Sequence, residues 1–224
     1  TMPKARIINN RALIIWLLVM LALALSPYYA SRYTIILLST ILMNVVLAVS
    51  WAMFSGPTKY ISLASAAFFG VGIYSAAVLG TKLPLPMVIA IGGLASFGLA
   101  VLVGAITLRL RGIYFVMFTF GLVELLMNFL LWFELNINDT TGRVVPSIDN
   151  TTVFYLLLIV FAVVMAAVYG LQNSKFGMAL KGIGENEDAA AHIGINVTVL
   201  KILTFGLSAV FMGLAGAIMA TRWT

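Results

Sequence analysis

A short polar segment near the end of the chain, residues 182–196, has the sequence GIGENEDAAAHIGIN. Long apolar stretches surround it, because 62% of the 224 residues are hydrophobic, only 9% are charged, and the mean hydropathy is +1.11. A soluble domain of this length carries far more charge on its surface. The contrast indicates a membrane protein in which this polar segment lies outside the bilayer.

The apolar stretches are long enough to cross a membrane as helices, which takes about 20 residues each. The strict alternation of barrel strands is absent, so the predicted fold class is all-α, a polytopic membrane helix bundle forming one domain over residues 1–224. Seven spans are expected, at about 12–29, 33–55, 64–80, 87–108, 113–133, 153–171 and 202–221. The third is short and contains Gly70 and Gly72, which predicts a broken or re-entrant segment. Because the chain stops directly after the seventh span, we expect further sequence and further spans beyond it.

The basic residues predict how the chain is oriented, because cytoplasmic loops are enriched in Lys and Arg. With the N-terminus inside, the cytoplasmic segments hold Lys4, Arg6, Arg11, Lys59, Arg109, Arg111, Lys175, Lys181 and Lys201. The outer segments hold only Arg32, Lys82, Arg143 and Arg222. We therefore expect a bacterial inner-membrane protein with a cytoplasmic N-terminus, and a cytoplasmic loop over residues 172–201. Topology accounts for the net charge of +6, so lipid is expected around the chain and nucleic acid is not an expected partner.

Small residues recur at helical spacing in two spans, which predicts close helix packing within the membrane. One stripe is Gly92, Ser96, Ala100 and Gly104, and the other is Gly213, Gly216, Ala217 and Ala220. Both are interpreted as packing seams.

Polar residues within the spans suggest a second kind of site. Gly121, Glu124 and Asn128 share one face of the fifth span, and a carboxylate at a helix centre costs about 2.5–3.5 kcal/mol on insertion scales. This face either borders a translocation path or is hydrogen-bonded to a neighbouring span, with Asn44 as a possible partner. A candidate substrate path is formed by Ser62, Ser65, Phe68 and Tyr74 near the broken third span, with Glu124 facing them and Asn128 on the same face as Glu124. Ordinary helix packing remains the alternative for each of them.

The opening segment contains the signals of one short helix over residues 187–193. Asn186 is a good N-cap, Glu187 and Asp188 suit the positive end of the helix dipole, and Gly194 suits a left-handed C-terminal stop. Such a helix is about 10 Å long. Because isolated helices shorter than about 12–15 residues are marginal in water, it must dock through Ala190 and Ile193. The docking surface is either its own spans or another protein.

Three stretches, in order along the chain, resemble one transporter family. They are SLASAAFFGVGIYSAAVLG (62–80), LRLRGIYFVMFTFGLVEL (108–125) and SKFGMALKGIGENEDAAAHIGINVTVLKILTFGLSAVFMGLAGAI (174–218). The last resembles the "EAA" coupling loop of ABC-importer permeases and, more closely, the corresponding loop and span of the branched-chain amino-acid permeases of the LivM and LivH type. The resemblance covers most of residues 33–221.

The resemblance implies a pore-forming permease subunit of an ABC importer that moves branched-chain amino acids into the cytoplasm. It implies a second permease subunit, identical or homologous, two cytosolic ATPases and an external substrate-binding protein. The ATPases would bind the coupling helix, which includes Asn186, Glu187, Asp188, Ala190, Ile193 and Gly194. The chain would be no enzyme and hold no cofactor, with ATP bound by the partner subunits, in agreement with the absence of a GxxxxGK[ST] stretch.

The sequence also departs from the family pattern and leaves alternatives open. Pro57, Thr58 and Ala64 replace expected residues around the serine-leucine segment, and the outer loop has the sequence NDTTGRVVPS. Urea, short amides or another amino acid therefore remain alternative substrates. An ion-coupled secondary transporter or channel using Glu124 is the main rival function, and a non-transporting scaffold subunit is another.

Overall fold

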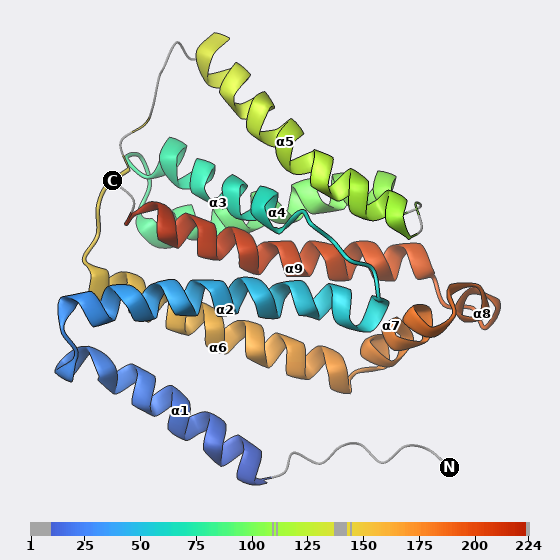
Figure 1. The fold of residues 1–224 in the computed structure, drawn as a ribbon, viewed down its shortest axis with the longest axis horizontal. Helices are drawn as coiled ribbons and strands as arrows, with labels where there is room; N and C mark the ends of the chain where they lie inside the picture. The colour runs from blue at the N-terminus through green and yellow to red at the C-terminus, as the bar shows by residue number, and fades with distance from the viewer. Residues whose placement is uncertain (1–9, 109, 111, 137–142, 144, 223–224) are drawn as a thin grey trace.

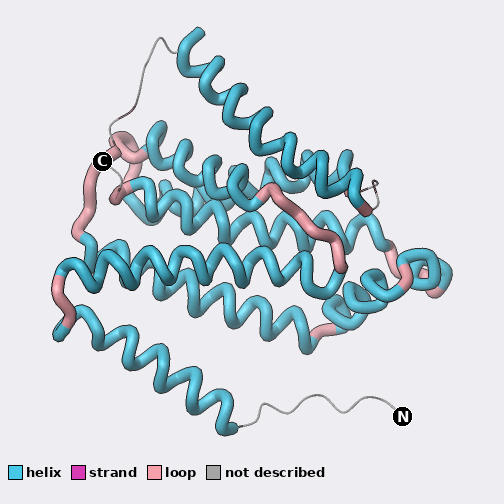
Figure 2. The backbone as a smooth tube through the Cα atoms, in the orientation of Figure 1, coloured by secondary structure: helices cyan, strands magenta, loops and turns pink. Residues whose placement is uncertain are grey.

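The computed structural model describes residues 10–108, 110, 112–136, 143 and 145–222, and side chains from residue 18 onward. Within these residues the regular structure is entirely helical, as predicted (Figures 1 and 2). The helices are α1 (Asn10–Tyr29), α2 (Arg32–Thr58), α3 (Ser65–Leu79), α4 (Leu85–Thr107), α5 (Ile113–Asn136), α6 (Asn150–Asn173), α7 (Lys175–Glu185), α8 (Glu187–His192) and α9 (Val197–Ala220). Lys4, Arg6, Arg109 and Arg111, used above for orientation, lie outside the described residues, as do residues 137–142 of the outer loop.

Five of the described helices, α2, α4, α5, α6 and α9, are long and apolar enough to cross a membrane. The expected count of seven is not confirmed. Of the two remaining expected spans, the described apolar part of α1 is Leu18–Tyr29, and α3 has only 15 residues. The predicted break at Gly70 and Gly72 is wrong, because α3 is continuous through both glycines; the irregular backbone instead lies before α3.

That irregular segment, residues 59–64, runs from the end of α2 beside α7 to the beginning of α3 (Figure 1). At 15 residues, α3 is about 22 Å long, short of the ~30 Å hydrocarbon core. Side chains from other helices form hydrogen bonds with the backbone of this segment. Leu63 N donates to Thr119 Oγ1 at 3.1 Å, and the Trp51 indole donates to the Ser62 carbonyl at 2.8 Å. Non-helical backbone at membrane depth needs such internal partners.

Helix α9 lies at the centre of the bundle, with α2, α3, α4 and α6 packed around it (Figure 1). In its most apolar 18-residue window 72% of residues are buried, against 33% or less in the other four candidate spans. The chain therefore assembles around α9, although α9 is the last helix in the sequence.

The two small-residue stripes meet at this centre, so the predicted packing seams are confirmed. A Cβ added at Gly216 would overlap the carbonyl oxygen of Phe69 in α3, and one at Gly213 would meet the Gly92 carbonyl oxygen in α4 at 2.6 Å. Because backbone atoms form these contacts, no side-chain movement can relieve them. Glycine is needed here for the close approach of the helices.

We expect Gly216→Ala to destabilise the protein, since α3 must move away from α9, whereas Gly98→Ala should not. Gly98 lies in α4 with nothing within 4 Å of an added Cβ. There the exchange should stabilise the helix by roughly 0.5–1 kcal/mol, because alanine is the better helix former. Thermal unfolding of the two variants in the same detergent compares them directly. Equal melting temperatures would contradict the proposed close packing.

Candidate functional site

Helices α7 and α8 form a compact unit at one end of the bundle (Figure 1). Ser174 caps α7 by accepting from Gly177 N at 3.2 Å, and Asn186 caps α8 by accepting from Ala189 N at 3.0 Å. Gly194 follows α8 with a φ of 87°, in the left-handed region. The short helix predicted from the sequence is thus present, with the predicted cap and stop. Its role in coupling stays a prediction.

The predicted docking face of α8 divides into two parts. Ala190 is buried and packs in a small cluster with Ile183 of α7 and Val197 of α9. Ile193 instead is 78% exposed and contributes nothing to this contact. Ala190 thus docks α8 on its own chain, whereas Ile193 is left as an apolar side chain on the outer surface, and its docking on another protein stays a prediction.

Glu187, the first residue of α8, points inward to a buried lysine that the sequence analysis treated only as a cytoplasmic charge. Lys201 lies one turn into α9, and its side chain is 1% exposed. Its Nζ lies 2.8 Å from Glu187 Oε1, 3.0 Å from the Leu108 carbonyl oxygen and 3.3 Å from Tyr60 Oη. Tyr60 Oη in turn donates to Glu187 Oε2 at 2.6 Å.

The Lys201 ammonium group makes two further favourable contacts. Leu108 is the C-cap of α4, where helix carbonyl groups lack partners and the dipole is negative. The ammonium group also lies 4.4 Å from the centre of the Tyr60 ring, within the range of a cation–π contact. The sequence shows a lysine early in an otherwise apolar helix. It does not show which groups pair with this lysine, because they are remote in sequence.

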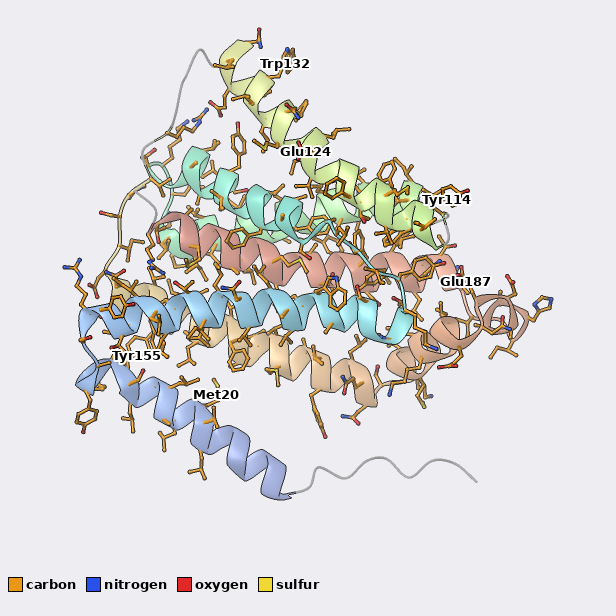
Figure 3. All side chains as sticks on the ribbon, viewed as in Figure 1. Met20, Tyr114, Glu124, Trp132, Tyr155 and Glu187 are labelled. Carbon is orange, nitrogen blue, oxygen red and sulfur yellow. The ribbon has the colours of Figure 1, made fainter. Side chains whose placement is uncertain are left out.

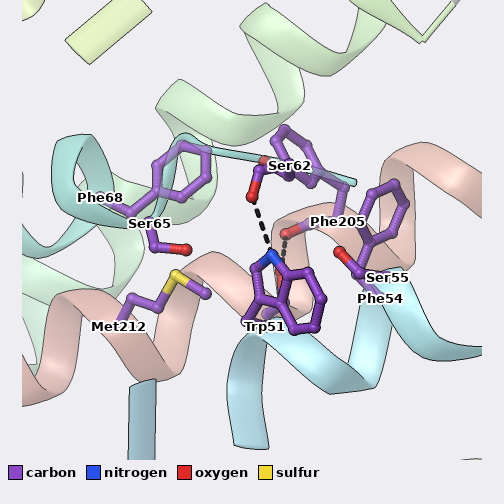
Figure 4. A pocket seen from close by; sticks show the side chains of 9 residues that line it. Trp51, Phe54, Ser55, Ser62, Ser65, Phe68, Phe205 and Met212 are labelled. Atoms are coloured by element: carbon purple, nitrogen blue, oxygen red, sulfur yellow. Dashed lines mark hydrogen bonds between the residues drawn. The ribbon is translucent and has the colours of Figure 1, made fainter. Parts of the chain in front are cut away.

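Three predicted substrate-path residues, Ser62, Ser65 and Phe68, line one small cavity between α2, α3 and α9 (Figure 4). Ser55 and Ser208 line it as well. Ser55 Oγ is the only buried side-chain N or O atom in the described part of the chain that has no hydrogen-bond partner. The space open to the centre of a water-sized sphere is about 10 Å³, whereas a single water needs roughly 10–15 Å³. An amino acid therefore does not fit here in this conformation, and a substrate role for these serines stays a prediction.

The other three predicted path residues lie elsewhere. Tyr74 Oη donates to Glu134 Oε1 at 2.6 Å, and Glu134 also pairs with Arg143 at 3.0 Å. Glu124, which lies midway along α5 (Figure 3), and Asn128 are exposed, and helical periodicity places both on the side of α5 opposite the buried Thr119. The expectation that Glu124 faces the serines near α3 is wrong, because Thr119 and its helical neighbours occupy that side. Asn44 donates to the Thr40 carbonyl instead of to Glu124.

Comparison with known proteins decides the family. Residues 33–224 match the family model described as "Branched-chain amino acid transport system / permease component". The chain belongs to this family. The match includes α2 to α9, and therefore the short helix α8, the buried lysine and the serine cavity.

Three named permease proteins are similar to this chain. The high-affinity branched-chain amino acid transport system permease protein LivM of Salmonella typhimurium is 24% identical over 253 residues, covering 93% of this chain and 57% of LivM. LivM of Escherichia coli is 24% identical over 247 residues with the same coverage. The nucleoside ABC transporter permease protein NupC of Lactococcus lactis is 33% identical over 108 residues, covering 44% of this chain and 34% of NupC. The chain thus spans little more than half the length of the LivM proteins, and no solved structure matches it.

We expect Lys201→Ala to lower stability by about 3 kcal/mol, because it leaves the Glu187 carboxylate and the Leu108 carbonyl without their cation. Broken buried pairs cost about 3–5 kcal/mol, and the 21% exposure of Glu187 favours the lower end. Lys59→Ala is the control, since Lys59 pairs with Glu185 at 2.9 Å but both side chains are more than half exposed. Exposed pairs contribute about 0–1 kcal/mol. Denaturant titration in detergent measures the unfolding free energy of each variant. An equal loss of unfolding free energy in the two variants would refute the assignment of Lys201 to a buried ion pair.

Proposed function

We propose that this chain is a pore-forming subunit of an ABC importer that moves branched-chain amino acids into the cytoplasm. Family membership and the names of the LivM relatives support this proposal. The structural feature that carries it is α8, a short helix fixed to the bundle on one side and bearing an exposed isoleucine, Ile193, on the other. Such a preformed apolar tip outside the spans suits docking of a second protein.

In this proposal two cytosolic ATPases bind α8 and its counterpart in a second permease subunit. ATP would be bound entirely by these ATPases, and a substrate-binding protein would deliver the solute on the opposite side of the inner membrane. Closure of the ATPases would displace α8, which is joined to α9 by Ala190 and by the Glu187–Lys201 pair. NupC is named a nucleoside permease, so the names of the relatives differ in the solute. We propose branched-chain amino acids because the LivM relatives cover more of the chain than NupC does.

The outer face of α5 supports a second permease subunit. Glu124 and Asn128 are exposed in the middle of a candidate span, and the Asn128 side chain donates to the backbone carbonyl of Glu124 in its own helix. An uncovered carboxylate in lipid costs about 2.5–3.5 kcal/mol. We therefore propose that this face borders the second subunit or a water-filled path between the two subunits.

Co-purification of an ATPase tests the proposed function directly. We expect Ile193→Arg to weaken ATPase binding roughly 30-fold, the effect of a 2 kcal/mol interface residue. Met178→Arg is the matched control, because Met178 is a 57%-exposed apolar residue on the neighbouring helix α7. It should leave binding near the wild-type level, as should the conservative Ile193→Leu. If the wild-type complex contained no ATPase under mild detergent, the importer proposal would be wrong.

Replacing the α5 carboxylate tests the proposed path. We expect Glu124→Gln to lower the transport rate at least fivefold in vesicles while leaving assembly with the ATPases intact, since Glu124 contributes little to the fold of this chain. Asn173→Asp, a charge change at an exposed position in α6, serves as the control. Should transport instead persist without ATP and depend on an ion gradient that Glu124→Gln abolishes, the secondary-transporter alternative would replace the importer.

A further inference from the structure

The cluster around Lys201 joins three parts of the chain that are distant in sequence. Glu187 begins α8, Tyr60 lies in the irregular segment 59–64, and Leu108 ends α4. The three supply oxygen atoms at 2.8, 3.3 and 3.0 Å from a single ammonium group. That group belongs to the central helix α9, so each part is fixed to the most buried element of the bundle.

The cluster is continuous with the serine cavity. The Tyr60 ring packs edge-on against Phe115 at 5.5 Å, and Phe115 contacts Phe54 and Phe205, which line the cavity. Along the backbone, Tyr60 is two residues from Ser62, whose carbonyl oxygen accepts the Trp51 indole hydrogen bond. A displacement of Tyr60 therefore reaches the cavity both through packed rings and through the chain.

A second ion pair joins segment 59–64 to the end of α7 at the surface. Lys59 Nζ lies 2.9 Å from Glu185 Oε1, but these side chains are 59% and 78% exposed. Water competes for such a pair, so it contributes little rigidity. The buried pair is different, because separating it would leave a lysine without its counter-ion in a position closed to water.

Close backbone packing strengthens the junction beside the cluster. A Cβ added at Gly184 of α7 would overlap the carbonyl oxygen of Pro57 near the end of α2. The α7–α8 unit is thus held against the start of segment 59–64 by a backbone contact and by the buried charges. The α7–α8 unit therefore cannot move along this segment without breaking both contacts.

We propose that Lys201 is a positioning residue that fixes α8, segment 59–64 and the end of α4 into one body, so that displacement of α8 moves the wall of the serine cavity directly. This inference rests on the proposed function, in which an ATPase displaces α8. Lys201 contacts neither ATPase nor solute in this scheme. It acts by keeping Glu187 and Tyr60 together.

The decisive variant removes both charges while preserving the shape of the cluster: Lys201→Met with Glu187→Gln. Because neither charge is left unpaired, this double variant should fold where single variants are destabilised. The matched control is Lys59→Met with Glu185→Gln, which removes the exposed pair at the same junction. Lys201→Arg is the conservative variant that should retain most of the function.

The first measurement is transport and ATP hydrolysis by the complete complex in proteoliposomes. We expect the buried double variant to transport at least fivefold less solute per ATP hydrolysed than the wild type, a ratio that already allows for any change in ATPase binding through Glu187. The control should keep the wild-type ratio. A wild-type ratio in the well-folded buried variant would overturn the inference. Absence of ATP-driven transport in the wild type would instead overturn the proposed function.

The second measurement is independent of transport. Amide hydrogen exchange in segment 59–64, where Tyr60, Leu63 and Ala64 donate to side-chain oxygens, reports whether the segment is held. We expect exchange at least tenfold faster in the buried double variant than in the exposed control, in both segment 59–64 and α8. Unchanged exchange would show that Lys201 does not hold these parts together. Faster exchange with no ATP-driven transport in the wild type would support the junction and refute its role in an importer.

Discussion

Close backbone contact between α9 and its neighbours is the constraint on which the rest of the structure depends. Gly213 and Gly216 bring α9 against α4 and α3 at distances that admit no side chain. Lipid is as apolar as the helices, so burial of apolar surface does not hold them together, and close packing does. Once α9 is central, the start of α9 is fixed beside the ends of α2 and α4. Lys201, one turn into α9, then reaches oxygen atoms from both regions and from α8.

Local sequence signals predicted the local structure, whereas the buried cluster depends on contacts that no local signal describes. Asn186, the acidic first turn and Gly194 specify α8 within a few residues of one another, and the small-residue stripes predicted the seams around α9. Lys201 is 141 residues from Tyr60 and 93 from Leu108. In the sequence it looks like any cytoplasmic lysine at the border of a span. The orientation of Glu124 failed for a related reason: periodicity defines the face of a helix but not which neighbour it meets.

A helix of six residues is too short to persist alone in water. Here α8 is ordered before any partner arrives, because Ala190 is buried against α7 and α9 and Glu187 is fixed by Lys201. A partner that binds the outer side of α8 consequently meets a surface whose conformational entropy has already been lost in folding. Preorganisation of this kind raises affinity without adding contacts. It also means that force applied to α8 acts on the bundle rather than on a flexible loop.

The cavity beside Ser62 and the polar face of α5 bear on where the proposed solute path would lie. The cavity beside Ser62 holds no more than a water-sized space, so an amino acid does not fit there in this conformation. The polar face of α5, by contrast, is open and points away from the bundle. A path for a polar solute needs polar walls that lipid cannot supply, and this face supplies one such wall. In the importer proposed above, the opposing wall comes from another polypeptide surface, so that the path lies between subunits and the interior of this chain transmits movement.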